Sequence, residues 1–451
     1  MRFCRKNFFN FIDFAFSPLI CLILRKINFM SFIEELKWRG MLHDCTPGVE
    51  ELLSTQKVTG YIGFDPTAPS LTIGNYVQIM LLTFLKKHGH TPIVLMGGAT
   101  GRIGDPSGKN EERQLKTYEE LDFNLAHQSN QMLQFLGSDP ANPIQIVNNY
   151  DFYKEMPVLE FLRVVGKHLT VNYMLSKDSV QNRLEQGISF TEFSYQLLQG
   201  YDFYCLKEKY NVLLQMGGSD QWGNITSGTE LIRRINGGKA YALTTPLLTK
   251  ADGTKFGKSD KGNIWLDAKL TTPYQFYQFW INADDRDMPK FYRYFSLKEK
   301  EEIESIETTY QDDPKTLKRI LAEELTSRIH GEASLAGIQQ VSALLFDPKF
   351  DAAQLGTLSP AQFDIIGEEI PKFHVTDDNN EMPMDGLLTE KSNIFPSKSE
   401  LRRAVQSNAL SINKIKIAAH DHNITKNDFV AGKYILVENG KKNKYLLVFN
   451  Q

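Results

Sequence analysis

Three polar side chains at helical spacing could bind a small polar molecule. Tyr195, Gln199 and Asp202 stand at positions i, i+4 and i+7 of the stretch FTEFSYQLLQGYDFYCL, so a helix would carry all three on one stripe. The stretch is too apolar for a free surface helix, and buried polar groups need hydrogen-bond partners. Two interpretations stay open at this point: a hydrogen-bond network internal to the protein, or a pocket for a small polar ligand.

A glycine-rich loop, MGGATGRIGDPSGKNEERQ, follows an apolar strand pattern and has cations behind it. Glycine lets a backbone approach a ligand closely, and open parallel sheets bind ligands where their strands end. Lys109 and Arg113 stand just beyond the glycines as candidate phosphate partners. The glycine spacing matches neither the Walker motif nor the dinucleotide-binding motif. A purely structural loop is an equal alternative for this segment taken alone.

Two helix starts carry small or hydrogen-bonding residues of the same kind. The segment QMGGSDQWGNI ends a second strand pattern and opens a helix with Asp220, Gln221 and Asn224. The segment SLTIGNYV opens another helix with Thr72 and Asn75 on either side of a glycine. The first of these segments repeats the strand-end geometry at which open parallel sheets bind ligands, and the second has the small residues of a helix start that a ligand approaches closely.

A lysine-rich segment, KADGTKFGKSDKG, has cations interleaved with glycines and hydroxyls. Its lysines are Lys250, Lys255, Lys258 and Lys261. A glycine-flexed loop with repeated lysines could clamp a polyphosphate as charge grows on it during a reaction. A lysine-rich surface turn is the ordinary alternative for this segment by itself.

The elements that must position these residues follow an α/β pattern. Residues 58–250 alternate short apolar runs with longer helical patterns, which is typical of a parallel sheet with crossover helices. The expected strands are VTGYIGF, PIVLMGG, PIQIVNN, NVLLQMGG and ALTTPLLT. An apolar helical insertion near 150–190 has two interpretations: a surface that packs on a partner subunit, or a second buried layer.

The chain after residue 270 changes character twice. Residues 271–350 read as all-helical, 351–394 lose periodicity and run acidic, and 395–451 start with a basic helix leading into a strand. We therefore expect a sheet-containing domain at 30–270, a helical domain, an acidic linker and a small basic tail domain. Ten Lys or Arg residues stand against four Asp or Glu residues from Phe395 onward.

Composition sets further bounds. The 451 residues are 41% hydrophobic and 23% charged with a formal net charge of −3, so only local basic patches would attract nucleic acid. The four cysteines are scattered with no histidine in metal-ligand register, which predicts a reduced, cytosolic protein without a zinc site. Residues 1–29 mimic a signal peptide, but Asn10, Asp13 and Pro18 interrupt the apolar run. We expect a spurious upstream start or a disordered extension there.

Taken together, these segments resemble a known enzyme family. DPTAPSLTIGN followed by KFGKS is similar to the two nucleotide signatures of class I aminoacyl-tRNA synthetases. GGATGRIGDPSGK, EFSYQLLQGYDF and GGSDQWGNI resemble the bacterial-type tyrosyl-tRNA synthetases in particular. SKSELRRAVQSNALSINK is similar to an S4-type RNA-binding module. The resemblance runs from about Met30 to the C-terminus.

The resemblance implies a fold and a reaction. It implies a Rossmann-like catalytic domain with a parallel sheet, an all-helical anticodon-binding domain and a small α+β S4-like tail. The enzyme would activate L-tyrosine with ATP to tyrosyl-adenylate and pyrophosphate, then transfer tyrosine to the 3′ end of tRNA(Tyr). ATP would enter as a substrate with Mg²⁺ on its phosphates, with no metal bound by the protein itself. A cytoplasmic homodimer, without membrane association, is implied as well.

The resemblance also assigns residues. It implies that tyrosine is bound by Tyr61, Thr100, Asp105, Tyr195, Gln199, Asp202 and Gln215, with Tyr61 and Asp202 at the phenol. It implies that ATP is bound by Gly63, Asp65, Thr67, Gly74, Gly218, Asp220, Gln221, Leu248 and Lys258. The implied catalytic residues are Thr72, Asn75, Lys109, Arg113, Lys255, Lys258 and Ser259. The implied RNA-binding residues are Lys398, Arg402, Arg403 and Lys414.

The chain departs from the family pattern at one place. Thr72 and Asn75 stand where the first signature usually has two histidines, a form that resembles tryptophanyl-tRNA synthetases. A tryptophanyl-type enzyme is therefore one alternative, against which the Tyr61 and Asp202 pair and the basic tail argue. A non-catalytic RNA-binding relative is a second alternative, and a nucleotidyltransferase on the same fold is a third. An RNA-binding relative would not need the lysine signature, and a nucleotidyltransferase would not need the helical domain and tail.

Overall fold

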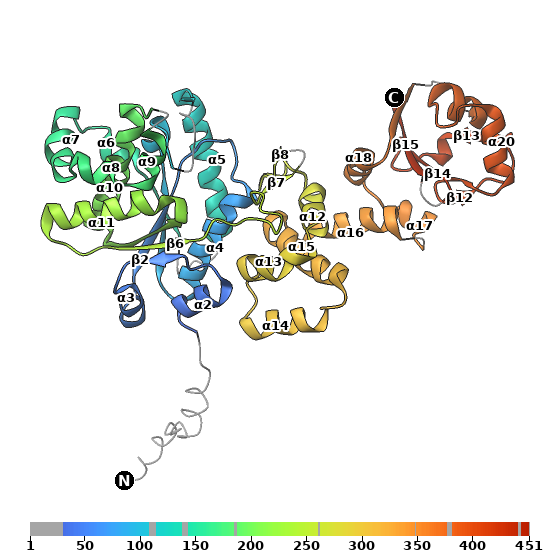
Figure 1. Ribbon diagram of the computed structural model, residues 1–451. Helices are drawn as coiled ribbons and strands as arrows, with labels where there is room; N and C mark the ends of the chain where they lie inside the picture. Colours follow the sequence, from blue (N-terminus) through green and yellow to red (C-terminus); the bar gives the residue numbers. More distant parts are fainter. Residues whose placement is uncertain are drawn as a thin grey trace, which may run out of the picture. The chain divides into compact units, whose positions relative to one another are not determined.

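A computed structural model describes residues 30–107, 114–137, 143–184, 187–259, 262–347, 349–376, 381–440 and 443–450 (Figure 1). The chain divides into two compact units. The first unit is Met1–Ser70 with Gly74–Thr249, and the second is Leu71–Ile73 with Lys250–Gln451. The prediction for residues 1–29 lies outside the described residues. Within the described part of the chain, none of the helices has the length and apolar character that crossing a membrane requires.

A six-stranded sheet forms the centre of the first unit, in the order β1-β6-β5-β2-β3-β4. Its parallel strands are β2 (Thr59–Phe64), β3 (Thr91–Met96), β4 (Gln145–Asn148), β5 (Val212–Gly218) and β6 (Tyr241–Thr245). All five overlap the expected strand segments, with β3 and β6 beginning one residue earlier, so the predicted Rossmann-like parallel sheet is confirmed. The edge strand β1 (Asp44–Cys45) pairs antiparallel with β6 and was not predicted, because two residues carry no pattern.

Helices cover both faces of this sheet. Figure 1 shows α4 (Ile73–Lys87) and α5 (Tyr118–Leu136) on one face, and α10 (Phe190–Tyr210) and α11 (Trp222–Asn236) on the other. The apolar face of α10 packs on α11, and its start is capped by Ser189, whose side chain accepts a hydrogen bond from the Glu192 amide. Before β2 the first unit also contains the helices α2 (Phe32–Arg39) and α3 (Val49–Thr55).

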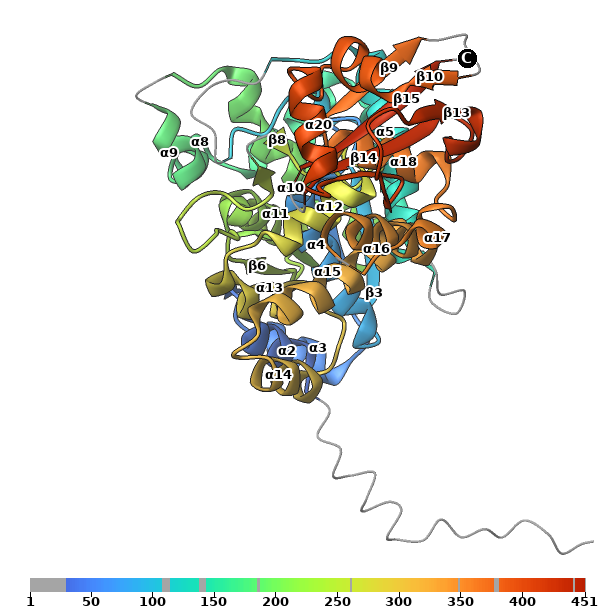
Figure 2. The ribbon, with the colours of Figure 1, turned by 90° about the vertical axis from the view of Figure 1, so that its right-hand side faces the viewer.

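The predicted helical insertion is present as a set of short helices. They are α6 (Tyr150–Tyr153), α7 (Val158–Val164), η2 (Gly166–His168), α8 (Val171–Leu175) and α9 (Asp178–Leu184). Figure 2 shows α8 and α9 side by side at the margin of the first unit. Val165, Leu169 and Met174 pack with Leu197 and Leu231, which fixes the inner face of the insertion. The outer face of α7 remains exposed, with Leu159 at 77% and Val158 at 69%.

The second unit begins with a segment from the first signature. Leu71–Ile73 pairs with the strand-like residues 264–266, beside the hairpin of β7 (Lys258–Ser259) and β8 (Gly262–Asn263). Helices follow, as expected for this stretch, around a core that contains Trp280, Phe291 and Phe295. They are α12 (Pro273–Ile281), η4 (Asp285–Asp287), α13 (Met288–Phe295), α14 (Lys300–Thr309), α15 (Pro314–His330) and α16 (Glu332–Phe346).

The rest of the second unit is an α+β tail with its own core. A five-stranded sheet has the order β12-β11-β14-β15-β9, and β10 pairs with β13. The strands are β9 (Lys372–Thr376), β10 (Glu381–Pro383), β11 (Leu410–Ile412), β12 (Ile415–Lys416), β13 (Asn423–Thr425), β14 (Tyr434–Asn439) and β15 (Asn443–Asn450). The helices are α17 (Ala352–Leu355), α18 (Pro360–Glu369), α19 (Met384–Gly386), η5 (Leu387–Lys391), α20 (Lys398–Gln406) and η6 (Lys426–Asp428).

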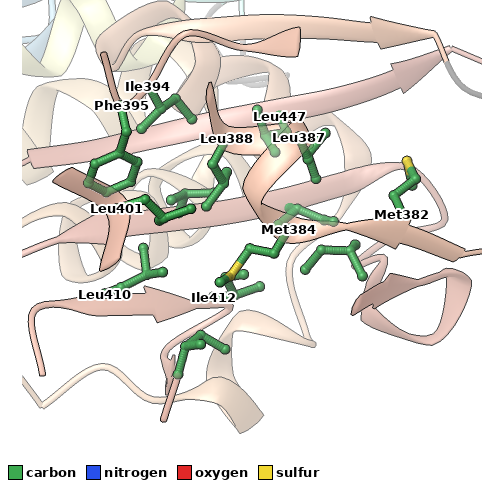
Figure 3. Packing of buried hydrophobic residues seen from close by; sticks show 14 of the residues in the cluster. Met382, Met384, Leu387, Leu388, Ile394, Phe395, Leu401, Leu410, Ile412 and Leu447 are labelled. Carbon is green, nitrogen blue, oxygen red and sulfur yellow. The ribbon is translucent and has the colours of Figure 1, made fainter. Parts of the chain in front are cut away.

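The expectation of an acidic linker at 351–394 is wrong for most of that segment. β9 pairs in parallel with β15, so it belongs to the tail sheet. Met382, Met384, Leu387 and Leu388 pack with Leu401, Leu410 and Leu447 in the tail core (Figure 3). Except for α18, the elements here are too short to show a hydrophobic period, although each one buries apolar side chains.

Candidate active site

A buried tyrosine and a buried aspartate lie at the centre of the first unit. Tyr61 comes from β2 and is fully buried, packed edge-on against Phe203 with ring centroids 5.3 Å apart. Its hydroxyl has no hydrogen-bond partner among the described residues. Asp202 comes from α10 and is 1% exposed. Burial raises the pKa of Tyr61 well above its ordinary value, and the nearby charge of Asp202 acts in the same direction.

Two donors hold the Asp202 carboxylate. The Asn149 amide Nδ2 donates to Oδ2 over 2.9 Å, and the Tyr153 hydroxyl lies 2.7 Å from Oδ1. Burial raises the pKa of Asp202 to about 7, although the hydrogen bonds from Asn149 and Tyr153 act in the opposite direction. The charge of Asp65 adds to the increase. An acid with a pKa near neutrality can accept a hydrogen bond from a ligand hydroxyl when it is ionised.

A chain of hydrogen bonds leads from Asp202 to Tyr195. Asn149 Nδ2 also donates to the Thr100 hydroxyl at 3.0 Å, and Thr100 donates to Asp65 Oδ1 at 2.6 Å. The Tyr195 hydroxyl donates to Asp65 Oδ2 at 2.8 Å. The structure therefore brings Thr100, Tyr195 and Asp202 together, as the sequence predicts, and joins them through Asp65. The resemblance gives Asp65 to ATP, so this network contains residues predicted for tyrosine and a residue predicted for ATP.

A second network surrounds Asp105. Its Oδ1 accepts from the Ser107 backbone at 3.0 Å and from Asn224 Nδ2 at 3.3 Å, and its Oδ2 accepts from Gln221 Nε2 at 2.7 Å. Asn224 comes from α11 and also reaches the Ser107 hydroxyl. Asp105 and Gln221, predicted for different substrates, are therefore direct partners. This network fixes the glycine-rich loop against the start of α11.

The two predicted glutamines differ in burial. Gln215 lies in β5, is 2% exposed, and its Oε1 has no partner among the described residues. Gln199 lies on α10 between Tyr195 and Asp202 and is half-buried. An orphaned buried amide oxygen costs about 1–3 kcal/mol, so Gln215 is a group that a ligand donor would satisfy.

The residues predicted for ATP in the first unit, except Gly74 in α4, lie at or just after the carboxyl ends of strands. Gly63 is exposed near the end of β2, with open space where a side chain would project, and Thr67 is exposed on the loop that follows. Gly218 ends β5, and Ser219 separates it from Asp220 and Gln221. A side chain at Gly218 would lie 2.6 Å from Asp220 Oδ1. Leu248, half-buried, follows β6. This is the edge at which parallel sheets bind ligands.

The predicted phosphate-binding residues are only partly described. Lys109 and Arg113 lie outside the described residues, as does the side chain of Ser259, whose backbone is in β7. Lys255 and Lys258 are exposed in the second unit. Between them, Phe256 is buried among Phe279, Trp280, Phe291 and Phe295, which anchors the loop.

The end of the first nucleotide signature, DPTAPSLTIGN, is held by backbone pairing and by the start of α4. Thr72 forms an antiparallel bridge with Trp265 in the second unit, and α4 begins one residue later. Asn75 is exposed in the first turn of α4, and Gly74 is half-buried before it. Lys250 Nζ donates to the Lys258 carbonyl at 3.1 Å, which ties the two ends of the lysine loop.

The predicted RNA-binding residues fall into two groups. Arg402 and Arg403 are exposed on α20, and Lys398, at its start, pairs with Asp385 and Glu390 at 3.1 and 3.2 Å. Lys414 is different: its side chain is 11% exposed and pairs with Glu438 at 2.9 Å. Lys414 therefore has little surface to offer a nucleic acid.

Sequence analysis missed Asn149 and Tyr153. Both come from the segment NNYDFY after β4, and neither belongs to a motif singled out in the sequence. The one available signal was the position of Asn149 at the end of a parallel strand, where ligand-binding residues gather.

Comparisons with known families agree with this geometry. Residues 53–347 match the family described as tRNA synthetases class I (W and Y). Residues 362–448 match the tyrosine–tRNA ligase SYY-like C-terminal domain. The second match begins inside the segment that we expected to be a linker, which is consistent with the strands and helices found there.

Curated relatives and solved structures are similar over most of the chain. A tyrosine–tRNA ligase of Cytophaga hutchinsonii is 53% identical over 93% of this chain and 100% of that protein. One from Bacteroides thetaiotaomicron is 49% identical with the same coverage. A C-terminally truncated mitochondrial tyrosyl-tRNA synthetase from Aspergillus nidulans matches with a TM-score of 0.65 and 29% identity over 72% of this chain and 97% of that one. The chain therefore belongs to the tyrosine–tRNA ligases, within the class I tRNA synthetases.

Proposed function

We propose that this protein activates L-tyrosine with ATP to form tyrosyl-adenylate and pyrophosphate, then transfers tyrosine to tRNA(Tyr). The observation that carries the proposal is the Tyr61 hydroxyl, which has no hydrogen-bond partner in the described part of the chain and lies near the buried carboxylate of Asp202. A phenol placed there would accept from Tyr61 and donate to Asp202. Membership of the tyrosine–tRNA ligases supports the same substrate.

The same pair accounts for selection against phenylalanine. A ligand without a hydroxyl would leave the Tyr61 donor and a buried carboxylate lone pair unsatisfied. Each such buried group costs about 1–3 kcal/mol, so the penalties reduce binding of phenylalanine more than the mere absence of a favourable interaction would. At the other end of the amino acid, Tyr195, Gln199 and Asp105 would receive the ammonium group.

The reaction needs little proton transfer. The carboxylate of tyrosine is ionised near neutral pH and attacks the α-phosphorus of ATP, which expels pyrophosphate. Catalysis then consists of positioning and of stabilising charge that grows on phosphate oxygens. We assign this stabilisation to Thr72 and Asn75 as neutral donors and to Lys255, Lys258 and Ser259. ATP would enter with Mg²⁺ on its phosphates, and Lys109 and Arg113 would bind the pyrophosphate.

We also propose that the protein acts as a homodimer with α7 at the interface. Val158, Leu159 and Leu162 form an exposed apolar surface on this helix, and large exposed apolar side chains gathered on one element are typical of contact surfaces. The inner face of the insertion is already buried in its own core, so the outer face is free to meet a second copy. A location in the cytosol stays a prediction from cysteine usage.

The tail would bind the tRNA backbone through α20. Arg402 and Arg403 are exposed on one helix and suit phosphate contacts. Lys414 instead forms an ion pair with Glu438. We therefore retain Lys398, Arg402 and Arg403 in this role and give Lys414 a structural one.

Amino-acid-dependent ATP–pyrophosphate exchange tests the proposed activity. Tyrosine, tryptophan and phenylalanine would be compared in parallel, and the expected result is exchange with tyrosine alone. Exchange with tryptophan would mean that Tyr61 and Asp202 do not read a phenol. If folded protein bound tRNA but catalysed no exchange, a non-catalytic RNA-binding relative would be the better description.

A further inference from the structure

Tyr153 contacts the specificity carboxylate but belongs to none of the recognised motifs. Its hydroxyl lies 2.7 Å from Asp202 Oδ1 and 2.8 Å from the Leu198 backbone carbonyl. Its ring packs against Phe161 of α7 and Tyr201 of α10, with centroids 6.1 and 5.7 Å away. Two helices therefore hold the ring, and the hydroxyl is left with two acceptors in reach.

A hydroxyl has one proton, so the two contacts cannot be equal. While Asp202 is ionised, the proton goes to the carboxylate, because a charge-assisted hydrogen bond is the stronger one. When Asp202 is protonated, its own O–H can donate to the Tyr153 oxygen while Tyr153 donates to the Leu198 carbonyl. Tyr153 therefore satisfies Asp202 Oδ1 in both protonation states.

The position of the carboxylate follows from these contacts. Asn149 donates to Oδ2 and Tyr153 to Oδ1, so the two oxygens are held from two different elements and the plane of the carboxylate is fixed. The remaining lone pairs are the ones that a ligand hydroxyl must meet. We infer that Tyr153 is a positioning residue for tyrosine recognition, whose hydroxyl orients the Asp202 carboxylate toward the phenol of the substrate. This inference rests on the proposed function and deepens it.

The surroundings of Asp202 make the inference measurable. The titratable groups that face it are Tyr61, Asp65, Tyr153, Tyr195 and Cys205. Burial raises the pKa values of the three tyrosines well above 10, and burial raises the pKa of Cys205 to about 12. These four groups stay neutral between pH 6 and 9, whereas Asp202 titrates near pH 7. Apart from the carboxyl of Asp65, Asp202 is therefore the group in this set whose charge changes near pH 7.

The test is Tyr153→Phe, assayed by tyrosine-dependent pyrophosphate exchange from pH 5.5 to 9. The KM for tyrosine should rise about tenfold at pH 7, while kcat at saturating tyrosine changes less than about twofold. The pH midpoint of 1/KM should move upward by about one unit, because the ionised carboxylate loses a donor. In an Asp202→Asn background, Tyr153→Phe should raise the KM by clearly less than its tenfold effect in the wild type, because no charged carboxylate is left for Tyr153 to orient.

Tyr201→Phe is the matched control. Its ring packs on Tyr153, but no hydrogen bond joins its hydroxyl to Asp202 among the described contacts, so KM and pH midpoint should stay at the wild-type values. Unchanged KM and pH midpoint in Tyr153→Phe would overturn the inference and leave the proposed function intact. A lower melting temperature with equal losses for ATP and tyrosine and no pH shift would show a structural role and would also overturn it. Absence of tyrosine-dependent exchange in the wild-type enzyme would instead remove the proposed function.

Discussion

Asp65 occupies the space where a side chain at Gly97 would stand. A Cβ built on Gly97 would lie 2.0 Å from Asp65 Oδ1 and 2.6 Å from the Thr100 hydroxyl. Because Asp65 holds both Thr100 and Tyr195, this glycine keeps the hydrogen-bond network closed at its centre. The first glycine of the loop therefore serves close packing against a carboxylate within the protein.

Gly97→Ala should reduce kcat/KM for tyrosine by about 100-fold or more, because the methyl group must displace Asp65 and break two hydrogen bonds. Gly166→Ala is the control, since a Cβ there meets only Leu162 carbons at 3.6 and 4.0 Å. Pyrophosphate exchange measures both variants. Equal activity of the two would show that the loop tolerates the displacement.

Asp202→Asn should change how stability depends on pH. The pKa of Asp202 is about 7 in the folded chain against an ordinary 3.8, so the folded state holds the extra proton between these values. The contribution of Asp202 to wild-type stability therefore falls as pH rises from about 4 to 7 and is constant above that. Asparagine does not titrate, so the variant does not lose this stability as pH rises. The melting temperature of the variant minus that of the wild type should therefore be larger at pH 8 than at pH 5.

The amide fits because Tyr153 can turn its proton to the Leu198 carbonyl and accept from the new NH₂ group. Tyrosine-dependent exchange should still drop sharply, since no carboxylate remains to accept the phenol proton. A melting difference that does not vary with pH would contradict the shifted pKa of Asp202.

Arg39→Ala should destabilise the first unit by about 3–5 kcal/mol, because it leaves Glu35 buried without its main partner. Arg39 pairs with Glu35 at 2.7 Å, and both side chains are almost fully buried. Lys37→Ala, on the same helix, removes an exposed pair with Glu50 and should cost less than about 1 kcal/mol. Urea unfolding at pH 7 compares the two variants.

The same cluster has a pH signature. Burial alone would raise the pKa of Glu35, but its hydrogen bond with His88 and the charges of Arg39 and Lys87 lower it to about 2. Its contribution to stability is therefore complete above about pH 4.5 and is lost as pH falls toward 2. Acid unfolding of Arg39→Ala should show a smaller component of this kind, because His88 and Lys87 still lower the pKa of Glu35.

A Leu159→Glu, Leu162→Glu double variant should shift the protein from a dimer to a monomer of 51.5 kDa in sedimentation velocity. Two charges on the outer face of α7 would have to be buried at the proposed interface, at a cost of several kcal/mol. Ile415→Glu, on an exposed tail position, is the control and should leave the dimer intact. Monomeric wild-type protein at micromolar concentration would contradict the homodimer.

An Arg402→Ala, Arg403→Ala double variant should weaken tRNA binding and reduce the salt dependence of log K by about 1 for each phosphate that is no longer neutralised. Tyrosine-dependent pyrophosphate exchange should stay at the wild-type rate, because that step needs no tRNA. Lys414→Ala should lower the melting temperature with little change in the salt dependence, since Lys414 is held by Glu438. If Lys414→Ala reduced the salt dependence of tRNA binding and the double variant did not, Lys414 would be the tRNA-binding residue and α20 would not.

The sequence predicts the parallel sheet because each strand is a run of apolar residues long enough to show against the helices around it. It predicts that Tyr195 and Asp202 are buried together because both follow one helical stripe of α10. The short elements between 351 and 394 could not be predicted in this way. Segments of three to five residues such as β10 and η5 contain too few positions to establish a period.

Two residues of the site could not be predicted for a different reason. Asn149 and Tyr153 reach Asp202 from a separate segment of the chain, so their role depends on where β4 ends in space. No spacing rule within one segment contains that information. The resemblance likewise implies a contact of Asp65 with ATP, although its hydrogen bonds go to two residues that the resemblance gives to tyrosine.

The bridge between Thr72 and Trp265 determines the order in which parts of the chain can fold during synthesis. All six strands of the first sheet have been made once Thr245 is added, but Leu71–Ile73 finds its partners only when residues 264–266 exist. Translation proceeds at about 5–20 residues per second, and domains fold as units as they emerge. A growing chain can therefore close the hydrogen bonds of Asp65 and Asp202 first, and a product that ends before residue 264 lacks the backbone pairing of the segment proposed to act on ATP.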